Sequence, residues 1–155
     1  MNMKTIVLFR QSMRRIERFV LLQNKNEATC CGVSLAQCHA LLEIGPSDGL
    51  SVKELSSRLG LDKSTLSRTV DSLVEGGLAE RAASPGDRRS VAVRLTARGR
   101  AAAERINRAW NRICADMFAS IPGKKHGSVV EAMDMIASAM ERCTCGFLKT
   151  RKCRK

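Results

Sequence analysis

Aromatic residues and long apolar runs are scarce in this sequence. It contains no tyrosine, one tryptophan and four phenylalanines, so a binding pocket lined by aromatic rings would be poorly supplied. A run of about eighteen apolar residues, which a membrane-spanning helix requires, occurs nowhere. The apolar run at residues 6–9 is followed directly by Arg10 and is too short for the core of a secretory signal. We therefore predict a cytoplasmic protein with no membrane partner.

The motifs of common enzymes are also absent. We find no internal repeats and no Gly-x-Ser-x-Gly, His-Glu-x-x-His or phosphate-binding glycine-rich loop. Residues 123–128 lack the spacing of a Walker motif, and His126 within them is predicted to be a solvated loop residue. The sequence therefore predicts a protein that is not an enzyme and requires no cofactor.

Basic residues outnumber acidic ones. Twenty-seven lysines and arginines face fifteen aspartates and glutamates, which gives a formal net charge of +12. Nucleic acid and anionic membrane surfaces are the partners that such a charge favours. The last seven residues, 149–155, include five cations and predict a disordered basic tail.

The first part of the chain predicts two helices. Apolar residues recur at spacings of three and four within residues 3–24, which is typical of one helix face, and we expect a loop at residues 29–32. Ser34 and Gln37 have the spacing of a capping box and predict a second helix that ends at Gly45.

Two short capped helices come next. Ser51 and Glu54 form another capping box, and Gly60 suits the left-handed conformation that ends a helix. Asp62 caps the following helix, which should end at Gly76. Two short helices joined by a three-residue turn that contains glycine are typical of a helix-turn-helix.

A hairpin and two long helices complete the chain. Residues 78–83 and 91–95 flank a turn that contains Pro85 and Gly86, so they predict a two-stranded wing. The apolar stripes of the two later helices are Ile106, Trp110, Ile113 and Met117 in the first, and Val129, Met133, Ile136 and Met140 in the second.

These elements predict a mainly α fold with a small β-hairpin wing, which is a winged helix-turn-helix. The helices at both chain ends are not needed to complete it, so we predict that they form a homodimerisation platform. Packing on each other within a monomer is the alternative. The predicted regions are residues 1–50 (N-terminal helices with a candidate sensing loop), 51–95 (winged helix), 96–148 (C-terminal dimerisation helices) and 149–155 (basic tail).

Four motifs resemble the MarR family of transcriptional regulators. They are residues 62–68, 75–78, 87–89 and 93–99, and the resemblance extends from the first helix to about residue 142. It implies a dimer with two DNA-binding lobes below a helical platform and a pseudo-palindromic operator. It also implies repression that is usually relieved by a small molecule, a metal or an oxidant.

The first two turns of the helix after Asp62 supply the candidate base and phosphate contacts, which are Lys63, Ser64, Thr65, Ser67 and Arg68. Arg68 is the candidate for specificity, because a bidentate arginine contact to guanine contributes about 1–3 kcal/mol of discrimination. The hydroxyls can contact bases or phosphates. An ion pair between Arg68 and Asp71 is the alternative use of this arginine.

The predicted wing adds a second contact with double-stranded DNA. The resemblance implies that Arg88 or Arg89 enters the minor groove and that Asp87 holds the wing arginine in place. Minor-groove arginines read groove width, so A·T-rich flanks are expected. A dimer would carry twice the charge of +12 and place its recognition helices roughly 34–36 Å apart. Binding should fall steeply with salt.

Seven cysteines are many for a cytoplasmic chain, where thiols stay reduced. Cys30, Cys31 and Cys38 could bind a soft metal such as Zn²⁺ or trivalent arsenic, because thiolates favour such ions. The candidates for a second cluster are Cys143 and Cys145. Cys38 and Cys143 also continue apolar stripes and Cys114 adjoins one, so each of these three has a core position as its alternative.

The sequence thus predicts a repressor that leaves DNA when its cysteines bind a soft metal or As(III). The alternatives are thiol oxidation as the signal, or a phenolic or lipophilic ligand between the first, second and fifth helices. A cytoplasmic metal-binding protein with incidental positive charge is the alternative from another class, and an architectural nucleic-acid binder would bind all sequences equally.

Overall fold

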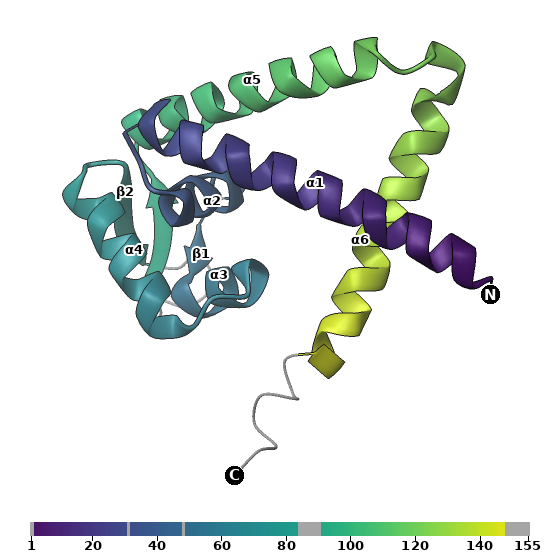
Figure 1. Ribbon diagram of the computed structural model, residues 1–155. Coiled ribbons are helices and arrows are strands. Elements are labelled where there is room, and N and C mark those ends of the chain that lie inside the picture. The colour runs from purple at the N-terminus through teal and green to yellow at the C-terminus, as the bar shows by residue number, and fades with distance from the viewer. Residues whose placement is uncertain (1, 31, 48, 84–90, 148–155) are drawn as a thin grey trace. The chain divides into compact units, whose positions relative to one another are not determined.

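The computed structural model describes residues 2–30, 32–47, 49–83 and 91–147 (Figure 1). The chain forms two compact units, an N-terminal unit of residues 1–109 and a C-terminal unit of residues 110–155. The predicted basic tail lies outside the described residues. No helix within the described ranges is sufficiently long and apolar to cross a membrane.

The N-terminal unit is mainly helical, as predicted. Its elements are α1 (Met3–Cys30), α2 (Leu35–Ile44), β1 (Leu50–Ser51), α3 (Val52–Leu59), α4 (Lys63–Glu75), β2 (Ala79–Ala83), β3 (Val91–Leu95) and the first part of α5 (Ala97–Ala119). Helices α3 and α4 are the predicted helix-turn-helix, and β2 and β3 are the strands of the predicted hairpin.

Helix α1 is longer than the sequence pattern predicts. It continues to Cys30, whereas we expected an end near residue 24 and a loop at residues 29–32. Asparagine is only mildly unfavourable in a helix, and no glycine or proline precedes Gly32, so the helix has no strong stop before that point. Cys30 is therefore a helical residue, and the prediction that placed it in a loop is wrong.

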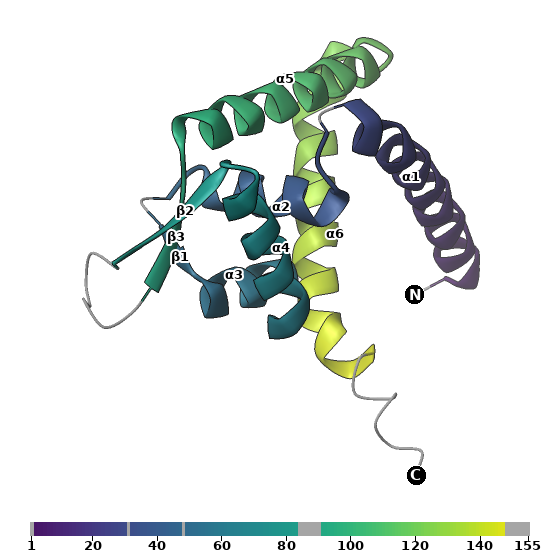
Figure 2. The ribbon, with the colours of Figure 1, turned by 90° about the vertical axis from the view of Figure 1, so that its left-hand side faces the viewer.

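The sheet has three antiparallel strands in the order β1-β3-β2. Strand β1 was not predicted, because two residues are too few to show an alternating pattern. It forms by pairing with β3, with Leu50 opposite Val93. In Figure 2 the strands lie at one side of α2, α3 and α4.

The core of the N-terminal unit lies where these helices meet the sheet. Its largest fully buried side chains come from α2, α3, α4 and β3: Leu41, Ile44, Leu55, Leu66, Val70, Leu73 and Val93. Burial of each such side chain contributes roughly 1.5–3 kcal/mol. The core therefore holds α4 with one face inward and the other exposed.

The C-terminal unit contains the rest of α5, a short 3-10 helix at Gly123–Lys125 and α6 (His126–Phe147). We predicted that His126 is a solvated loop residue, and this prediction is wrong. His126 is the half-buried first residue of α6. Its Nε2 lies 3.1 Å from the carbonyl oxygen of Phe118 and 2.9 Å from that of Ile121, at the end of α5. Its ring also meets Phe118 edge to face, with the ring centroids 4.9 Å apart. His126 therefore fastens the turn between α5 and α6.

Candidate nucleic-acid interface

Asp62 organises the start of α4. It is the N-cap, and its Oδ1 accepts a hydrogen bond of 2.9 Å from the backbone N–H of Thr65. Ser64 Oγ also donates to Oδ1, and Thr65 Oγ1 donates to Oδ2, each at 2.6 Å. The hydrogen bonds from Ser64 and then Thr65 hold the pKa of Asp62 well below its usual value. The carboxylate is therefore ionised and fixed at the first turn.

Helix α4 buries one face and exposes the other. Leu66, Val70 and Leu73 are buried, with spacings of four and three residues. Of the predicted DNA contacts on α4, Ser67 is half-buried, and the others are exposed at the start of the helix: Lys63, Ser64, Thr65 and Arg68. The fold thus places four predicted contacts together on the solvent face of a rigidly packed helix.

Arg68 is available for a partner. Within the described part of the chain its guanidinium takes part in no ion pair or hydrogen bond. Asp71, which we considered as its alternative partner, instead accepts a hydrogen bond of 2.7 Å from Arg81 Nη2 on β2. Asp71 is therefore paired with Arg81 and not with Arg68.

The same ion pair joins β2 to α4. Arg81 and Asp71 are ten residues apart in sequence, and their side chains are about half exposed, at 44% and 47%. Exposed pairs contribute only about 0–1 kcal/mol, so we assign this pair a role in orientation rather than stability. Neither residue was among the predicted functional residues, because nothing in their sequence spacing indicates the contact.

A second link joins α2 to α4. Gln37 completes the predicted capping box, since its Oε1 accepts a hydrogen bond of 2.7 Å from the backbone N–H of Ser34. Its Nε2 donates to Ser72 Oγ on α4, at 2.9 Å. The first turn of α2 is therefore connected to the helix that carries Arg68.

The turn between α3 and α4 is also closely determined. Gly60 ends α3 in the left-handed conformation, with φ 62°, and Ser56 Oγ donates to the carbonyl oxygen of Leu61 at 2.8 Å. At the other end of α3, Ser51 and Glu54 form the predicted capping box. The hydrogen bonds from Ser51 lower the pKa of Glu54.

Thr96 and Gly99 join the wing to α5. Thr96 Oγ1 donates to the carbonyl oxygen of Gly77 at 2.8 Å and accepts from the backbone N–H of Gly99 at 3.1 Å. A Cβ atom on Gly99 would lie 1.8 Å from the carbonyl oxygen of Leu78. The Thr-x-x-Gly motif therefore allows the start of α5 to pack closely against Leu78, the residue before β2.

The predicted wing contacts Asp87, Arg88 and Arg89 lie outside the described residues. The strands that flank them are described, with Ala83 opposite Val91 at the end nearest the wing tip. Their predicted roles stay predictions.

The predicted thiol cluster is only partly described. Cys38 is half-buried in the first turn of α2, where its backbone N–H donates to the carbonyl oxygen of Ser34 at 2.8 Å. Cys31 and the side chain of Cys30 lie outside the described residues, as do the side chains of Cys143 and Cys145. Among the described side chains no three His, Cys, Asp or Glu residues form a metal site. The metal site stays a prediction.

Two neighbouring cavities lie between α2, β3 and α5 in the N-terminal unit. Their volumes are about 280 and 570 Å³, and their linings share Gly45, Leu95 and Arg100. Arg94 lines the larger cavity, and its buried Nε has no hydrogen-bond partner in the described part of the chain. A buried donor of this kind favours a bound acceptor.

Comparisons with known proteins agree with this geometry. The sequence profile of the MarR family matches residues 32–90. A protein of Thauera aromatica, named as a candidate transcriptional regulator of the hcr operon, is 30% identical over 125 residues, which are 81% of this chain and 69% of that protein. The chain matches between 31% and 69% of the length of its curated relatives.

Solved structures share the fold. A MarR family protein from Bacillus stearothermophilus superposes with a TM-score of 0.81 at 22% identity, covering 91% of this chain and 99% of that one. Streptococcus pneumoniae FabT, solved in complex with DNA, superposes with a TM-score of 0.73 at 17% identity, covering 91% of this chain and 99% of that one.

Proposed function

The chain belongs to the MarR family of transcriptional regulators, and from that premise we propose that it is a homodimeric repressor that reads its operator with α4. Family membership makes it a DNA-binding regulator rather than an enzyme. The exposed guanidinium of Arg68 is the observation that carries the assignment of α4, because the Asp71 carboxylate next to it is already paired with Arg81.

The matched test compares Arg68 with Lys63, which is also exposed on α4. Arg68→Ala should cost about 1–3 kcal/mol of discrimination between the operator and random DNA. Lys63→Ala should weaken binding to both by a similar factor and reduce the salt dependence. Mobility-shift assays on DNA upstream of the protein's own gene would measure both effects. An equal loss on operator and random DNA for the two variants would contradict this division of roles.

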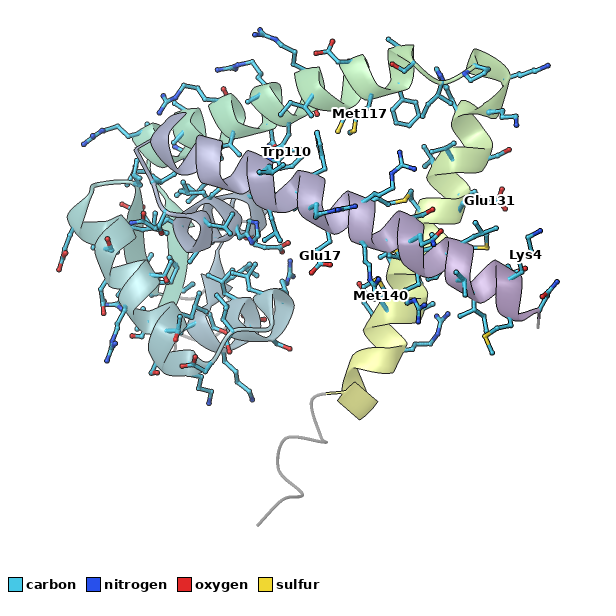
Figure 3. All side chains as sticks on the ribbon, in the orientation of Figure 1. Lys4, Glu17, Trp110, Met117, Glu131 and Met140 are labelled. Atoms are coloured by element: carbon cyan, nitrogen blue, oxygen red, sulfur yellow. The ribbon has the colours of Figure 1, made fainter. Side chains whose placement is uncertain are left out.

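Exposed apolar side chains support the homodimer. On α1 they include Leu8 and Leu22, which are 56% and 62% exposed. In the C-terminal unit Met117 projects from α5 and Met140 from α6 (Figure 3), and Met133 is 47% exposed. Exposed apolar side chains on helices that contribute nothing to the buried core are typical of a surface that a partner covers. We propose that a second copy of the chain covers them.

Thiol coordination is the proposed signal for release. The candidate ligands are Cys30, Cys31 and Cys38. Cys30 is the last residue of α1, and Cys38 lies in the first turn of α2. A soft metal or As(III) held by thiolates there would displace the first turn of α2. The hydrogen bond from Gln37 to Ser72 would carry that displacement to α4. Release of most bound DNA requires several kcal/mol of differential affinity, which thiolate coordination can supply.

A triple Cys→Ser variant at these positions tests the signal. Arsenite or Zn²⁺ under reducing conditions should release DNA from the natural protein but not from the variant. Release only by peroxide, reversed by a reductant, would favour the redox alternative. A variant that still releases DNA in arsenite and in peroxide contradicts both.

A small-molecule effector is the second candidate, and the two cavities beside Arg94 and Arg100 favour it. Their linings include no aromatic side chain among the described residues, so an acidic ligand held by arginine suits them better than a stacked ring. Salicylate-like compounds added to the same assay, with Arg94→Ala as the comparison, would test this candidate.

A further inference from the structure

The two hydroxyls at the start of α4 have no hydrogen left for DNA. Ser64 Oγ and Thr65 Oγ1 each lie 2.6 Å from an oxygen of Asp62. An ionised carboxylate can only accept hydrogen bonds, so both hydroxyls must donate to it. What Ser64 and Thr65 present to a partner is therefore their oxygen lone pairs.

The rest of the exposed face has the opposite polarity. Arg68 follows Ser64 by four residues, which is about one turn and about 6 Å along the helix axis. A guanidinium has five N–H donors and no acceptor. The face thus offers acceptors at its first turn and donors one turn later, and Asp62 sets the first of these.

We propose that Asp62 makes the first turn of α4 a reader of exocyclic amino groups, those of adenine N6 or cytosine N4, within about two base pairs of the guanine contacted by Arg68. The inference rests on the proposed role of α4 in DNA binding. In the major groove only these two base groups donate hydrogen bonds, whereas guanine and thymine present acceptors on their edges. About 6 Å along the helix axis corresponds to roughly two steps of 3.4 Å along a DNA strand.

The same polarity argues against a phosphate contact at this turn. A phosphate oxygen needs a donor, and both hydroxyl hydrogens are occupied by Asp62. The fixed negative charge of Asp62 also repels a phosphate. The hydroxyls of Ser64 and Thr65 are therefore assigned to base reading and not to backbone positioning.

Asp62→Asn inverts the polarity of the Thr65 hydroxyl without removing the cap. Asparagine caps helices about as well as aspartate, and its carbonyl oxygen can still accept from the Thr65 N–H. Its NH₂ group would take the place of Oδ2 and donate to Thr65 Oγ1, which frees the hydrogen of that hydroxyl for DNA, whereas Ser64 still donates to the carbonyl oxygen. The variant should therefore prefer guanine or thymine where the natural protein prefers adenine or cytosine.

Selection of binding sites from random double-stranded DNA, followed by sequencing, measures this change. Glu75→Gln is the control, because it changes the charge by the same amount at the other end of α4. We expect at least a fivefold reversal of base preference for Asp62→Asn and none for Glu75→Gln. If Asp62→Asn fails to fold by thermal melting, Asp62→Ser replaces it, since serine also caps helices but has no carboxylate.

The outcomes separate this inference from the proposed function. Selective binding by the natural protein with an unchanged preference in the Asp62 variant overturns the inference and leaves the DNA-binding role of α4 intact. A natural protein that selects guanine or thymine at this position also overturns it. A natural protein that selects no sequence at all overturns both.

Discussion

Apolar side chains are buried in the segment between Val33 and Ile106 but largely exposed on the helices at the two ends of the chain. Within the described residues, every buried apolar side chain lies in that segment. Helices α1 and α6 contribute none, yet they expose Leu8, Leu22, Met133 and Met140. The winged helix therefore has its own core, whereas the terminal helices leave large apolar side chains exposed.

The polar contacts that tie α4 and α5 to their neighbours lie in the same segment. The hydrogen bonds of Gln37, Thr96 and Arg81 to other elements all fall within it. The bonds of Gln37 and Arg81 tie α4 to α2 and to β2. We expect a DNA-binding regulator to need this rigidity around α4.

The largest expected effect is a loss of stability when Gly99, in the segment between Val33 and Ile106, is replaced. Gly99→Ala would place a Cβ 1.8 Å from the carbonyl oxygen of Leu78, so it should lower the free energy of unfolding by about 3 kcal/mol. Chemical denaturation measures the change. Gly123→Ala is the control, because nothing lies within 4 Å of its Cβ position, and it should change stability by less than about 0.5 kcal/mol. Equal stability of the two variants would contradict the close approach.

The next effect concerns the terminal helices. Met133→Glu should weaken self-association at least tenfold, about 1.4 kcal/mol, because the dimer would bury a carboxylate without a partner. Sedimentation at several concentrations measures the association. Asp134→Asn, also exposed on α6, should leave it unchanged. A Met133 variant that associates as tightly as the natural protein argues against the proposed dimer surface on α6.

A smaller effect is expected at the ion pair that joins α4 to β2. Single and double alanine variants of Asp71 and Arg81 should give a coupling energy of about 0.2–1 kcal/mol in unfolding experiments. We also expect the single variants to lower operator affinity, because the wing strand loses its link to α4. Additive effects of the two substitutions on both stability and affinity would show that the pair orients nothing.

The smallest effect is the pH dependence from Glu54. Hydrogen bonds from Ser51 lower its pKa in the folded state from the ordinary value of 4.5. Its contribution to stability is therefore present above that value and is lost as the pH falls through the lowered pKa. Thermal unfolding of Glu54→Gln should show the largest deficit near neutral pH and a shrinking deficit below about pH 4.5. A deficit that does not vary with pH would contradict this account of the cap.

Local signals in the sequence predicted most of the winged helix. The capping boxes at Ser34 and Ser51 and the N-cap at Asp62 are confirmed as the starts of α2, α3 and α4. Caps act within one turn, so residue spacing is sufficient to find them. The hairpin strands were found for a similar reason, since a proline and glycine turn marks their connection.

Contacts between distant residues could not be predicted. Strand β1 exists only because β3 offers it a partner, and Gln37 meets Ser72 across 35 residues of sequence. The predicted end of α1 was wrong, because the weak local signals at the asparagines did not stop the helix. The prediction for His126 was wrong because its partners are the carbonyl groups of Phe118 and Ile121. These groups meet His126 only after the chain has turned from α5 into α6.

The sequence by itself determined that α4 begins at Asp62 and that Ser64 to Arg68 lie on its first two turns, because helix capping and periodicity are local. Only the tertiary structure decided that Arg68 is left for a partner, because it paired Asp71 with Arg81 on β2. The hydrogen bonds from Ser64 and Thr65 to Asp62 span two and three residues and belong to the local cap. Hydrogen-bond capacity depends on the partners that a side chain meets in space, and sequence spacing does not specify those partners.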